Sequence, residues 1–361
     1  QSPTDRQRPA DSEVTILFYA DTRMDPIGNY KQEDHKKFID KILENEKNNG
    51  INYLLFGGDS ELFGFFKFMW KWFFGAMKKF EVAYPGIKIY PAIGNHELIL
   101  SDIFKKNLTR LNKNYQGVSL KSIEKKLEKD IDNNKTPTPF FKELYSIYEK
   151  SVKENENGLG ILNTSTYENF SWERFKYYVD AWPHLKGNPN IQLKKTYYSF
   201  NLPIGNSGRF VKIIVVDSNK KNLSAEQRKW YANELQFTGG PVITICHHPL
   251  FYPETGNGEF SNWRVPPHLF LVGHVHDYER RSQDGGTRNP PFHIISGSGG
   301  VPLGGIDPKR CSDPTTKCIK SYNYCRITIN LEKISVIVFG CDKIDNPLTP
   351  IDQMAFNWNN S

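Results

Sequence analysis

The sequence has no long hydrophobic run. None of the apolar stretches in its 361 residues is long enough to cross a bilayer, so no membrane-spanning helix is expected. It also has no dense run of basic residues, although its formal net charge is +7. That excess either biases the surface toward anionic substrates or only aids solubility, and no nucleic-acid partner is expected from it.

The five cysteines are too few to decide the compartment of the protein. Cys311 and Cys318 flank a short proline-containing loop, and they could pair in an oxidising compartment. Cys246 lies in an apolar run beside His247 and is expected to be a buried thiol. The chain begins at Gln1 rather than Met, through either a chosen boundary or removal of a signal peptide. We expect export to the periplasm, the outside of the cell or a vacuole.

The first hundred residues alternate apolar runs with one helical pattern. After a polar arm at residues 1–13, strands are predicted at Val14–Tyr19, Tyr53–Phe56 and Ile87–Ile93. Residues 31–49 carry apolar side chains at helical spacing, and Gly50 is a natural helix end. This order of strand, helix and strand indicates crossover connections and a largely parallel central region.

The second half of the chain predicts further strands and one helix. The strands are expected at Thr196–Leu202, Val211–Asp217, Val242–Cys246, Leu269–Val272, His293–Ser296, Tyr324–Asn330 and Ile334–Phe339. Ser224 followed by Gln227 forms a capping box, which predicts a helix from there to Leu235. Two short sheets packed face to face, with helices outside, suit this order. The domain is therefore expected to span residues 14–345, with residues 346–361 as a tail.

Two segments stand outside this pattern. Residues 101–175 are rich in Lys, Glu and Asn, with two helical stretches, and are interpreted as a helical insert that either lies over a site or only decorates the fold. Phe63–Phe80 interleaves aromatic residues with lysines. Burial is the commonest fate of such a helix, but contact with a membrane or a position beside a substrate stays open.

Polar motifs stand where predicted strands end. They are Ala20–Arg23, Gly58–Asp59, Gly94–Glu97, His247–Pro249 and Gly273–His276. Oxygen donors of Asp and Asn mixed with imidazoles suit two divalent or trivalent ions held close together. Such a pair activates water and clamps a phosphate during in-line attack. Gly58, Gly94 and Gly273 are expected to let the backbone turn sharply.

The order of these motifs resembles that of the calcineurin-like metallophosphoesterases, and within them the purple-acid-phosphatase-like branch. Residues 273–280, which read Gly-His-Val-His-Asp-Tyr-Glu-Arg, are similar to the last motif of that branch. Ile294–Gly300 and Val215–Asn219 also look similar, and the resemblance covers residues 14–100 and 195–340. It implies an α/β fold, a four-layer αββα sandwich of two mixed β-sheets flanked by helices.

The resemblance also implies two metal ions, such as iron, zinc or manganese. Asp59 would bridge them, and the other ligands divide into Asp21 and His276 for the first site and Asn95, His247 and His274 for the second. The implied reaction is hydrolysis of a small phosphorylated substrate by a metal-activated hydroxide, with phosphomonoesters favoured. A phosphodiesterase or nucleotide hydrolase of the same fold is the alternative.

Two further histidines lie within the motifs. In the resembled family the position of His96 is near the phosphate, where an imidazole can protonate the leaving oxygen or stabilise negative charge. Glu97 is expected to be its partner. His248 is expected to face away from His247, because neighbouring residues of an extended chain point to opposite sides. Structural roles are expected for His35, His184, His268 and His293.

Two positions depart from the pattern of the family. Arg23 stands where the general family has a metal-binding His, and Leu62 stands where the purple branch has a metal-binding Tyr. The first metal site would then be the weaker one, with Asp25 as a candidate replacement. Arg23 either holds a phosphate oxygen or forms a salt bridge. A non-catalytic binding protein with a degenerate first metal site is the rival hypothesis.

Overall fold

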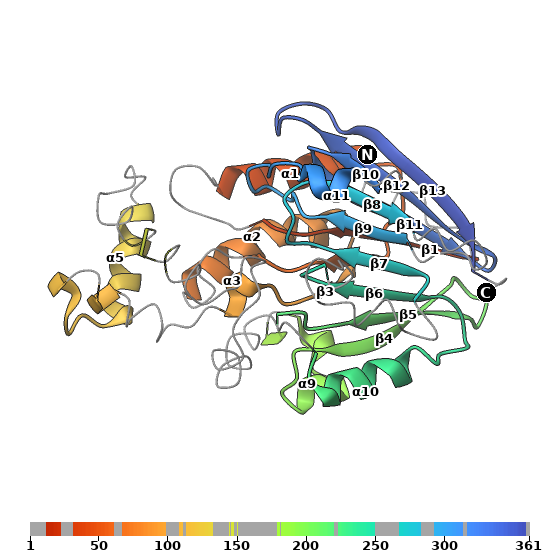
Figure 1. The fold of residues 1–361 in the computed structure, drawn as a ribbon, viewed down its shortest axis with the longest axis horizontal. Coiled ribbons are helices and arrows are strands. Elements are labelled where there is room, and N and C mark those ends of the chain that lie inside the picture. Colours follow the sequence, from red (N-terminus) through yellow and green to blue (C-terminus); the bar gives the residue numbers. More distant parts are fainter. Residues whose placement is uncertain are drawn as a thin grey trace.

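The computed structural model describes residues 12–22, 32–60, 67–98, 108–110, 113–132, 144, 146–147, 150, 179–180, 182–219, 223–249, 267–282, 292–312 and 316–358. Two β-sheets form the centre of the molecule, and helices lie outside them (Figure 1). The mixed two-sheet sandwich expected from the motifs is therefore the fold of the chain. Most of the predicted insert and most of the N-terminal arm lie outside the described residues.

The first sheet is parallel at one side and antiparallel at the other. Its strand order is β13-β12-β11-β1-β2-β3. The parallel strands are β1 (Glu13–Tyr19), β2 (Tyr53–Phe56) and β3 (Lys88–Pro91). The antiparallel part contains β11 (Tyr322–Asn330), β12 (Lys333–Cys341) and β13 (Thr349–Asn357).

The second sheet is built around four parallel strands. Its order is β10-β8-β9-β7-β6-β5-β4. The parallel strands are β5 (Phe210–Val215), β6 (Val242–Cys246), β7 (Leu269–Val272) and β9 (Phe292–Ser296). The remaining strands, β4 (Tyr198–Pro203), β8 (Tyr278–Ser282) and β10 (Thr316–Ile319), run antiparallel to their neighbours.

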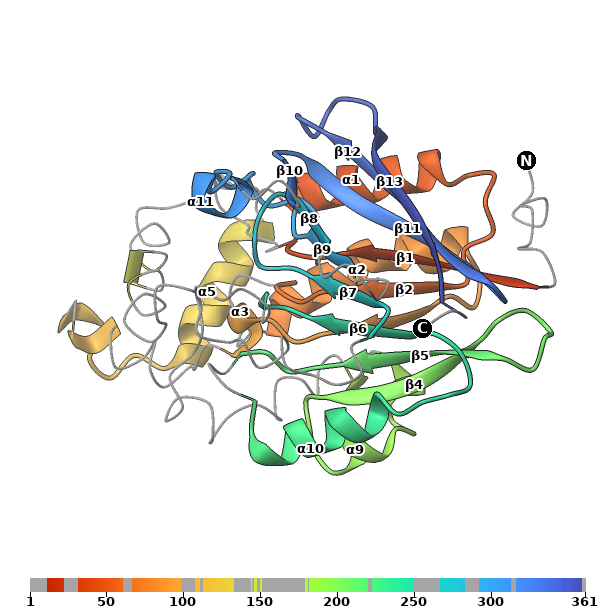
Figure 2. The ribbon, with the colours of Figure 1, turned by 45° about the vertical axis from the view of Figure 1, so that its right-hand side comes forward.

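Alternating side chains of the central strands separate the layers of the core. In β5, Ile213 belongs to the large core that both sheets share, whereas Ile214 belongs to a second cluster with Tyr231 of helix α10 (Ala225–Glu234). On the other sheet, Tyr19 of β1 packs its ring against Phe38 of helix α1 (Gln32–Asn45). Side chains of a strand point alternately to its two faces, so each sheet is buried on both. Figure 2 shows α10 along the outer side of β4 and β5.

The aromatic segment forms a helix that is buried along one side. Helix α2 (Lys67–Ala83) places Met69, Phe73 and Phe80 in the core with no exposed surface. Burial is thus confirmed for the described part of this segment, while residues 63–66 lie outside it. Within the described ranges, no helix is both long and apolar enough to cross a bilayer.

Sequence and structure agree closely where strands are apolar, whereas the more polar strands β8, β10 and β13 were not predicted. The predicted bounds of β2, β6 and β7 match the observed strands, and Ser224 caps α10 by accepting a hydrogen bond from the Gln227 amide at 3.1 Å. The prediction of a tail at residues 346–361 is wrong, because residues 349–357 form β13 on the edge of the first sheet. An edge strand buries little side-chain surface, so no apolar run marked it.

The cysteines behave as their sequence positions suggest. Cys311, at the end of helix α11 (Pro308–Cys311), is joined by a disulfide to Cys318 of β10. Cys246 is buried, and that burial raises the pKa of its thiol to about 12. The disulfide is compatible with an oxidising compartment, and export of the protein stays a prediction.

Asp352 on β13 links the two sheets at their edges. Its carboxylate accepts hydrogen bonds from Tyr278 Oη and Arg280 Nε, both at 2.7 Å, and from Lys317 Nζ at 2.9 Å. Burial favours the neutral acid, but these three donors outweigh it and lower the pKa of Asp352. Because the pKa is lower in the folded state, the contribution to stability is complete above the ordinary Asp value of 3.8 and is lost as the pH falls below it.

We expect Asp352→Asn to lower the free energy of unfolding by about 1–3 kcal/mol at pH 7, because hydrogen bonds to a buried charge are among the stronger ones. Urea denaturation of both proteins at pH 7 and near pH 2, below the ordinary Asp value, measures this. The difference should shrink at the lower pH. Asp345→Asn is the control, since the pair of Asp345 with Lys37 is solvent-exposed and contributes less than about 1 kcal/mol. Equal losses in the two variants would contradict a special role for Asp352.

Candidate metal centre

The polar motifs meet because they follow strands whose carboxyl ends lie together. Asp21 and Asp59 follow β1 and β2 of the first sheet, and Asn95 begins the short helix α3 (Asn95–Leu98) after β3. His247 and His274 follow β6 and β7 of the second sheet. The ladder between β1 and β2 continues into these loops, with the amide of Asp21 donating to Gly58 O at 3.0 Å. Loops at the carboxyl ends of parallel strands commonly hold the site of an α/β fold.

Three candidate ligand atoms converge on His247 Nε2. It lies 3.0 Å from Asn95 Oδ1, 3.2 Å from Asp59 Oδ1 and 3.3 Å from His274 Nδ1. The other ring nitrogen, Nδ1, lies 2.8 Å from Gly57 O and donates to it, because a carbonyl can only accept. A metal-binding histidine is usually oriented by such a bond to a backbone carbonyl. Nε2 thus faces the position that a cation would take.

The charge of this cluster also fits a cation. Burial works to lower the pKa of His247, but the carboxylates of Asp59, Asp21 and Glu97 outweigh it and raise the pKa to about 9. At neutral pH the imidazole therefore holds an extra proton between oxygen ligands. The proton supplies positive charge where a metal ion would otherwise supply it. The donor set therefore fits the metal that the motifs imply.

A second group of ligand atoms surrounds Asp21. One ligand atom from each of Asp21, Asp59 and His247 lies within 4.8 Å of the others. Asp21 Oδ1 is 3.7 Å from His276 Nε2, and Asp21 Oδ2 accepts a hydrogen bond from the amide of His274 at 2.7 Å. The structure thus brings all six predicted metal ligands into one cluster. Arg23, Asp25 and Leu62, which bear on the first site, lie outside the described residues.

Three of these residues adopt a backbone conformation that is rare for them. The φ angles of Asp21, Asp59 and His274 are +58°, +54° and +69°. A non-glycine residue in this left-handed region costs about 1–2 kcal/mol, and such residues concentrate at functional sites. Hydrogen bonds hold two of these residues, since the amide of Asp59 donates to Glu97 Oε2 and the amide of His274 donates to Asp21 Oδ2.

The glycines of the motifs act mainly through their small size. Only Gly58 has a positive φ, of +91°, whereas a sharp turn was also expected at Gly94 and Gly273. A Cβ at Gly94 would lie 2.2 Å from Asp59 Oδ1, and one at Gly273 would lie 2.7 Å from Asp21 Oδ2. These two positions therefore need glycine because a ligand carboxylate approaches the backbone closely.

Glu97 supports the ligand loops rather than His96, contrary to expectation. Its Oε2 accepts hydrogen bonds from the amides of Asp59 and Gly94 at 3.1 and 2.8 Å. Its Oε1 accepts from the amide of Ser60 at 2.5 Å and from the hydroxyl of the same residue. One buried carboxylate thus fixes two loops, and this could not be read from the sequence because it depends on how the loops fold toward each other.

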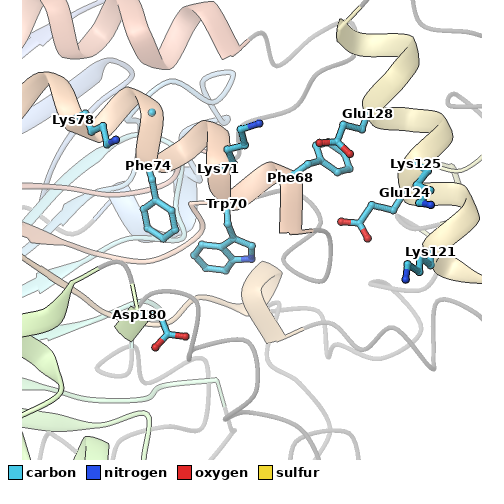
Figure 3. Close-up of a pocket in the computed structure, with 11 residues that line it drawn as sticks. Phe68, Trp70, Lys71, Phe74, Lys78, Lys121, Glu124, Lys125, Glu128 and Asp180 are labelled. Atoms are coloured by element: carbon cyan, nitrogen blue, oxygen red, sulfur yellow. The ribbon is translucent and has the colours of Figure 1, made fainter.

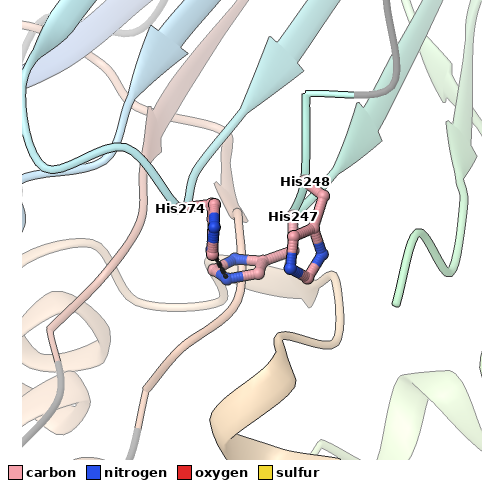
Figure 4. A group of neighbouring side chains, drawn as sticks. All are labelled: His247, His248 and His274. Carbon is pink, nitrogen blue, oxygen red and sulfur yellow. Dashed lines mark hydrogen bonds between the residues drawn. The ribbon is translucent and has the colours of Figure 1, made fainter. Parts of the chain in front are cut away.

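His248 faces the cluster, which corrects the prediction that it points away from His247. The chain leaves β6 at Cys246, so the alternation of an extended strand no longer holds. The ring of His248 packs against that of His274 with centroids 4.2 Å apart, and ligand atoms of the three histidines lie within 4.8 Å of one another (Figure 4). Ser218 Oγ holds this turn by accepting from the amides of His247 and His248 at 3.1 and 2.8 Å. Its role was missed in the sequence.

The other described histidines take structural positions, as expected. His35 stacks on Phe73, and burial lowers its pKa to about 3. Burial also lowers the pKa of His293 to about 3. His184 contacts the carbonyl of Ile89 at 3.0 Å. His268 accepts a hydrogen bond from the amide of Val242 at 3.0 Å.

Comparison of the sequence with protein families agrees with this geometry. The profile of the calcineurin-like phosphoesterase family matches residues 14–278, which is most of the chain, so the protein belongs to that family. A search of curated protein sequences gives no significant match.

Several solved structures share the fold at low sequence identity. A purple acid phosphatase from yellow lupin (Lupinus luteus) seeds has a TM-score of 0.56 and 12% identity over 97% of this chain and 54% of its own. The structure of PhoD has a TM-score of 0.56 and 9% identity over 96% of this chain and 70% of its own. GAP50, described as the anchor in the inner membrane complex of Plasmodium, has a TM-score of 0.52 and 10% identity over 96% of this chain and 89% of its own. The chain thus spans about half the length of the lupin protein (54%), and the likeness concerns the fold.

We expect Glu97→Gln to loosen the metal cluster without removing a ligand. The amide NH₂ of Gln would meet backbone N–H donors, so two of the four hydrogen bonds would be lost. Metal affinity should fall about 10–100-fold, as it does when residues that orient ligands are removed. Equilibrium dialysis followed by elemental analysis measures it. Ser60→Ala, which removes only the hydroxyl bond, should have the smaller effect, and metal affinity unchanged in Glu97→Gln would contradict the assigned role.

Proposed function

We propose that the protein hydrolyses phosphomonoesters with two bound metal ions. The observation that carries this proposal is that Asp59 lies close to members of both sets of ligands. Its Oδ1 is 3.2 Å from His247 Nε2, and ligand atoms of Asp21, Asp59 and His247 lie within 4.8 Å of one another. A carboxylate has two oxygens and can serve two ions, whereas an amide or imidazole in that position could not.

The ligands would divide as the family motifs imply. Asp21 and His276 would hold the first ion, Asn95, His247 and His274 would hold the second, and Asp59 would touch both. Bound ions of this kind supply a Lewis acid for the phosphate and lower the pKa of water. Glu97 and Ser218 keep the ligand loops in place, so little reorganisation is needed when substrate arrives.

His96 is proposed to act on the leaving group or on the charge of the phosphate. His96 Nε2 lies 3.8 Å from Asp59 Oδ2, and the backbone amide of His96 donates a hydrogen bond to Asp59 Oδ1 at 3.1 Å. The imidazole is therefore held beside the Asp59 carboxylate, where it could give a proton to a leaving group. Arg23 is proposed to hold a phosphate oxygen, because a guanidinium binds phosphate through two parallel hydrogen bonds.

Two other functions remain as alternatives. A phosphodiester or nucleotide substrate would use the same ligand set. The preference for monoesters rests on the resemblance of residues 273–280 to the last motif of the purple-acid-phosphatase-like branch. A non-catalytic role is the second alternative, because the family's metal-binding His and the branch's metal-binding Tyr are replaced by Arg23 and Leu62. Retention of all six ligand side chains in one cluster favours an enzyme.

We expect the protein to hydrolyse an aryl phosphate when Mn²⁺ or Zn²⁺ is added, and a chelator should abolish the reaction. Asp59→Asn should lower kcat at least ~100-fold, because the bridging carboxylate positions both ions and charge stabilisation of this kind contributes several kcal/mol. Initial rates on an aryl monoester and an aryl diester measure the loss and the preference. Asp345→Asn, which alters an exposed carboxylate, is the control. Folded, metal-loaded protein without activity on either ester would favour the non-catalytic alternative.

His96→Ala should slow turnover by about 10²–10⁴-fold, the usual contribution of a general acid, while metal content stays the same. The loss should be smaller for aryl phosphates whose leaving groups are already weak bases, because these need no proton. Steady-state rates across a series of leaving-group pKa values, together with elemental analysis, measure both effects. Loss of metal in the variant would instead make His96 a ligand or a support.

A further inference from the structure

A cavity of about 880 Å³ lies between helix α2 and helix α5 (Leu120–Asp132), the described helix of the predicted insert (Figure 3). The residues that line it are Phe68, Trp70, Lys71, Phe74, Gly75 and Lys78 of α2, Lys121, Glu124, Lys125 and Glu128 of α5, and Asp180. This volume falls within the range of roughly 300–1,000 Å³ that is typical of small-molecule sites. None of these residues belongs to the metal cluster.

The two walls of the cavity differ in polarity. On the α2 wall the half-buried ring of Phe74 faces the space, whereas Trp70 lies behind it with only 1% of its surface exposed. The lining residues of α5 recur every three or four positions and so form one face of that helix, which is polar. Ile123 and Leu127, two apolar residues of α5, are buried in the core. An accessible aromatic ring on one wall and charged side chains on the other match a ligand with an apolar body and a charged end.

The charge at the cavity favours an anion. Four lysines line it, and none of Lys71, Lys78, Lys121 and Lys125 forms an ion pair with another residue that the structure describes. Of the three lining carboxylates, Asp180 is already paired with Lys186 at 3.2 Å. The four lysines therefore exceed the two remaining glutamates, so an incoming anion meets a net positive field.

Gly75 provides a means of closing the cavity. It stands in the interior of α2, and a Cβ built on it would meet no atom within 4 Å. A large side chain at this position would therefore enter the cavity without displacing the helix. Alanine at the same position would leave the space open and favour the helix, since glycine is a poor helix former.

We propose that this cavity binds one molecule of a single-chain anionic amphiphile, a compound with an apolar chain and a terminal anion. The chain would lie against Phe74, and the anion would meet the lysines of both helices. A long-chain carboxylate has this chemistry, and it has no phosphate ester for the proposed enzyme to cleave. Binding at the cavity and hydrolysis at the metal cluster can therefore succeed or fail separately.

The test is calorimetric titration of the full chain with dodecanoate below its aggregation concentration. Dodecanol and dodecyltrimethylammonium, which share the chain but not the negative charge, are the comparison ligands. We expect dodecanoate to bind at one site and at least about tenfold more tightly than either, the effect of one charge-assisted contact. Replacing Lys71 and Lys125 together by Gln should remove that preference. The same change at Lys333 and Lys343, exposed lysines that do not line the cavity, should leave it intact.

The glycine variants separate the cavity from the outer surface. Gly75→Trp should abolish binding of dodecanoate, whereas Gly75→Ala should retain it, and circular dichroism would confirm that both fold. Undiminished binding to Gly75→Trp, or no binding to the unmodified protein, would overturn the proposal. Sedimentation with anionic vesicles tests whether the protein instead binds the anionic surface of a lipid bilayer. Binding to vesicles alone, unchanged in Gly75→Trp, would show attraction to a lipid surface and would also overturn it.

Discussion

The contact between Asp59 and His247 is the constraint on which the site depends. Asp59 leaves the first sheet and His247 leaves the second, and their ligand atoms meet at 3.2 Å. The two sheets must stack with the carboxyl ends of β2 and β6 together for this to happen, so the packing of the whole sandwich fixes one interatomic distance. Side chains that divide between a shared core and an outer cluster, as in β5, maintain that stacking.

Concentrating negative charge in this way has a cost that the surrounding residues offset. Asp21, Asp59 and Glu97 are all fully buried, and two of them lie on turns with positive φ. Hydrogen bonds from backbone amides hold these carboxylates, and the raised pKa of His247 supplies positive charge. Such an arrangement favours bound cations over an empty cluster, which explains why a strained and strongly charged site is compatible with a stable fold.

The sequence predicted the apolar strands and the six candidate ligands that the structure brings together, but not the more polar strands or the details of the loops. Strands such as β2, β6 and β7 are buried and therefore short and apolar, so they can be recognised in the sequence. The clustering of these six side chains was predictable because each stands in a family motif after a strand. Edge strand β13, the supporting role of Glu97 and the orientation of His248 were not predicted, since each depends on contacts between distant segments. The same holds for the cavity, whose two walls come from helices α2 and α5.

The central claim is that this cluster holds two ions with Asp59 between them. Anomalous diffraction from crystals soaked in Mn²⁺ tests it most directly, because it locates each ion without reference to activity. We predict two peaks about 3.5–4 Å apart, as in other two-metal sites, on either side of the Asp59 carboxylate. The peak beside Asn95, His247 and His274 should have the higher occupancy, and the peak beside Asp21 and His276 the lower. A single peak, or peaks away from Asp59, would contradict the account.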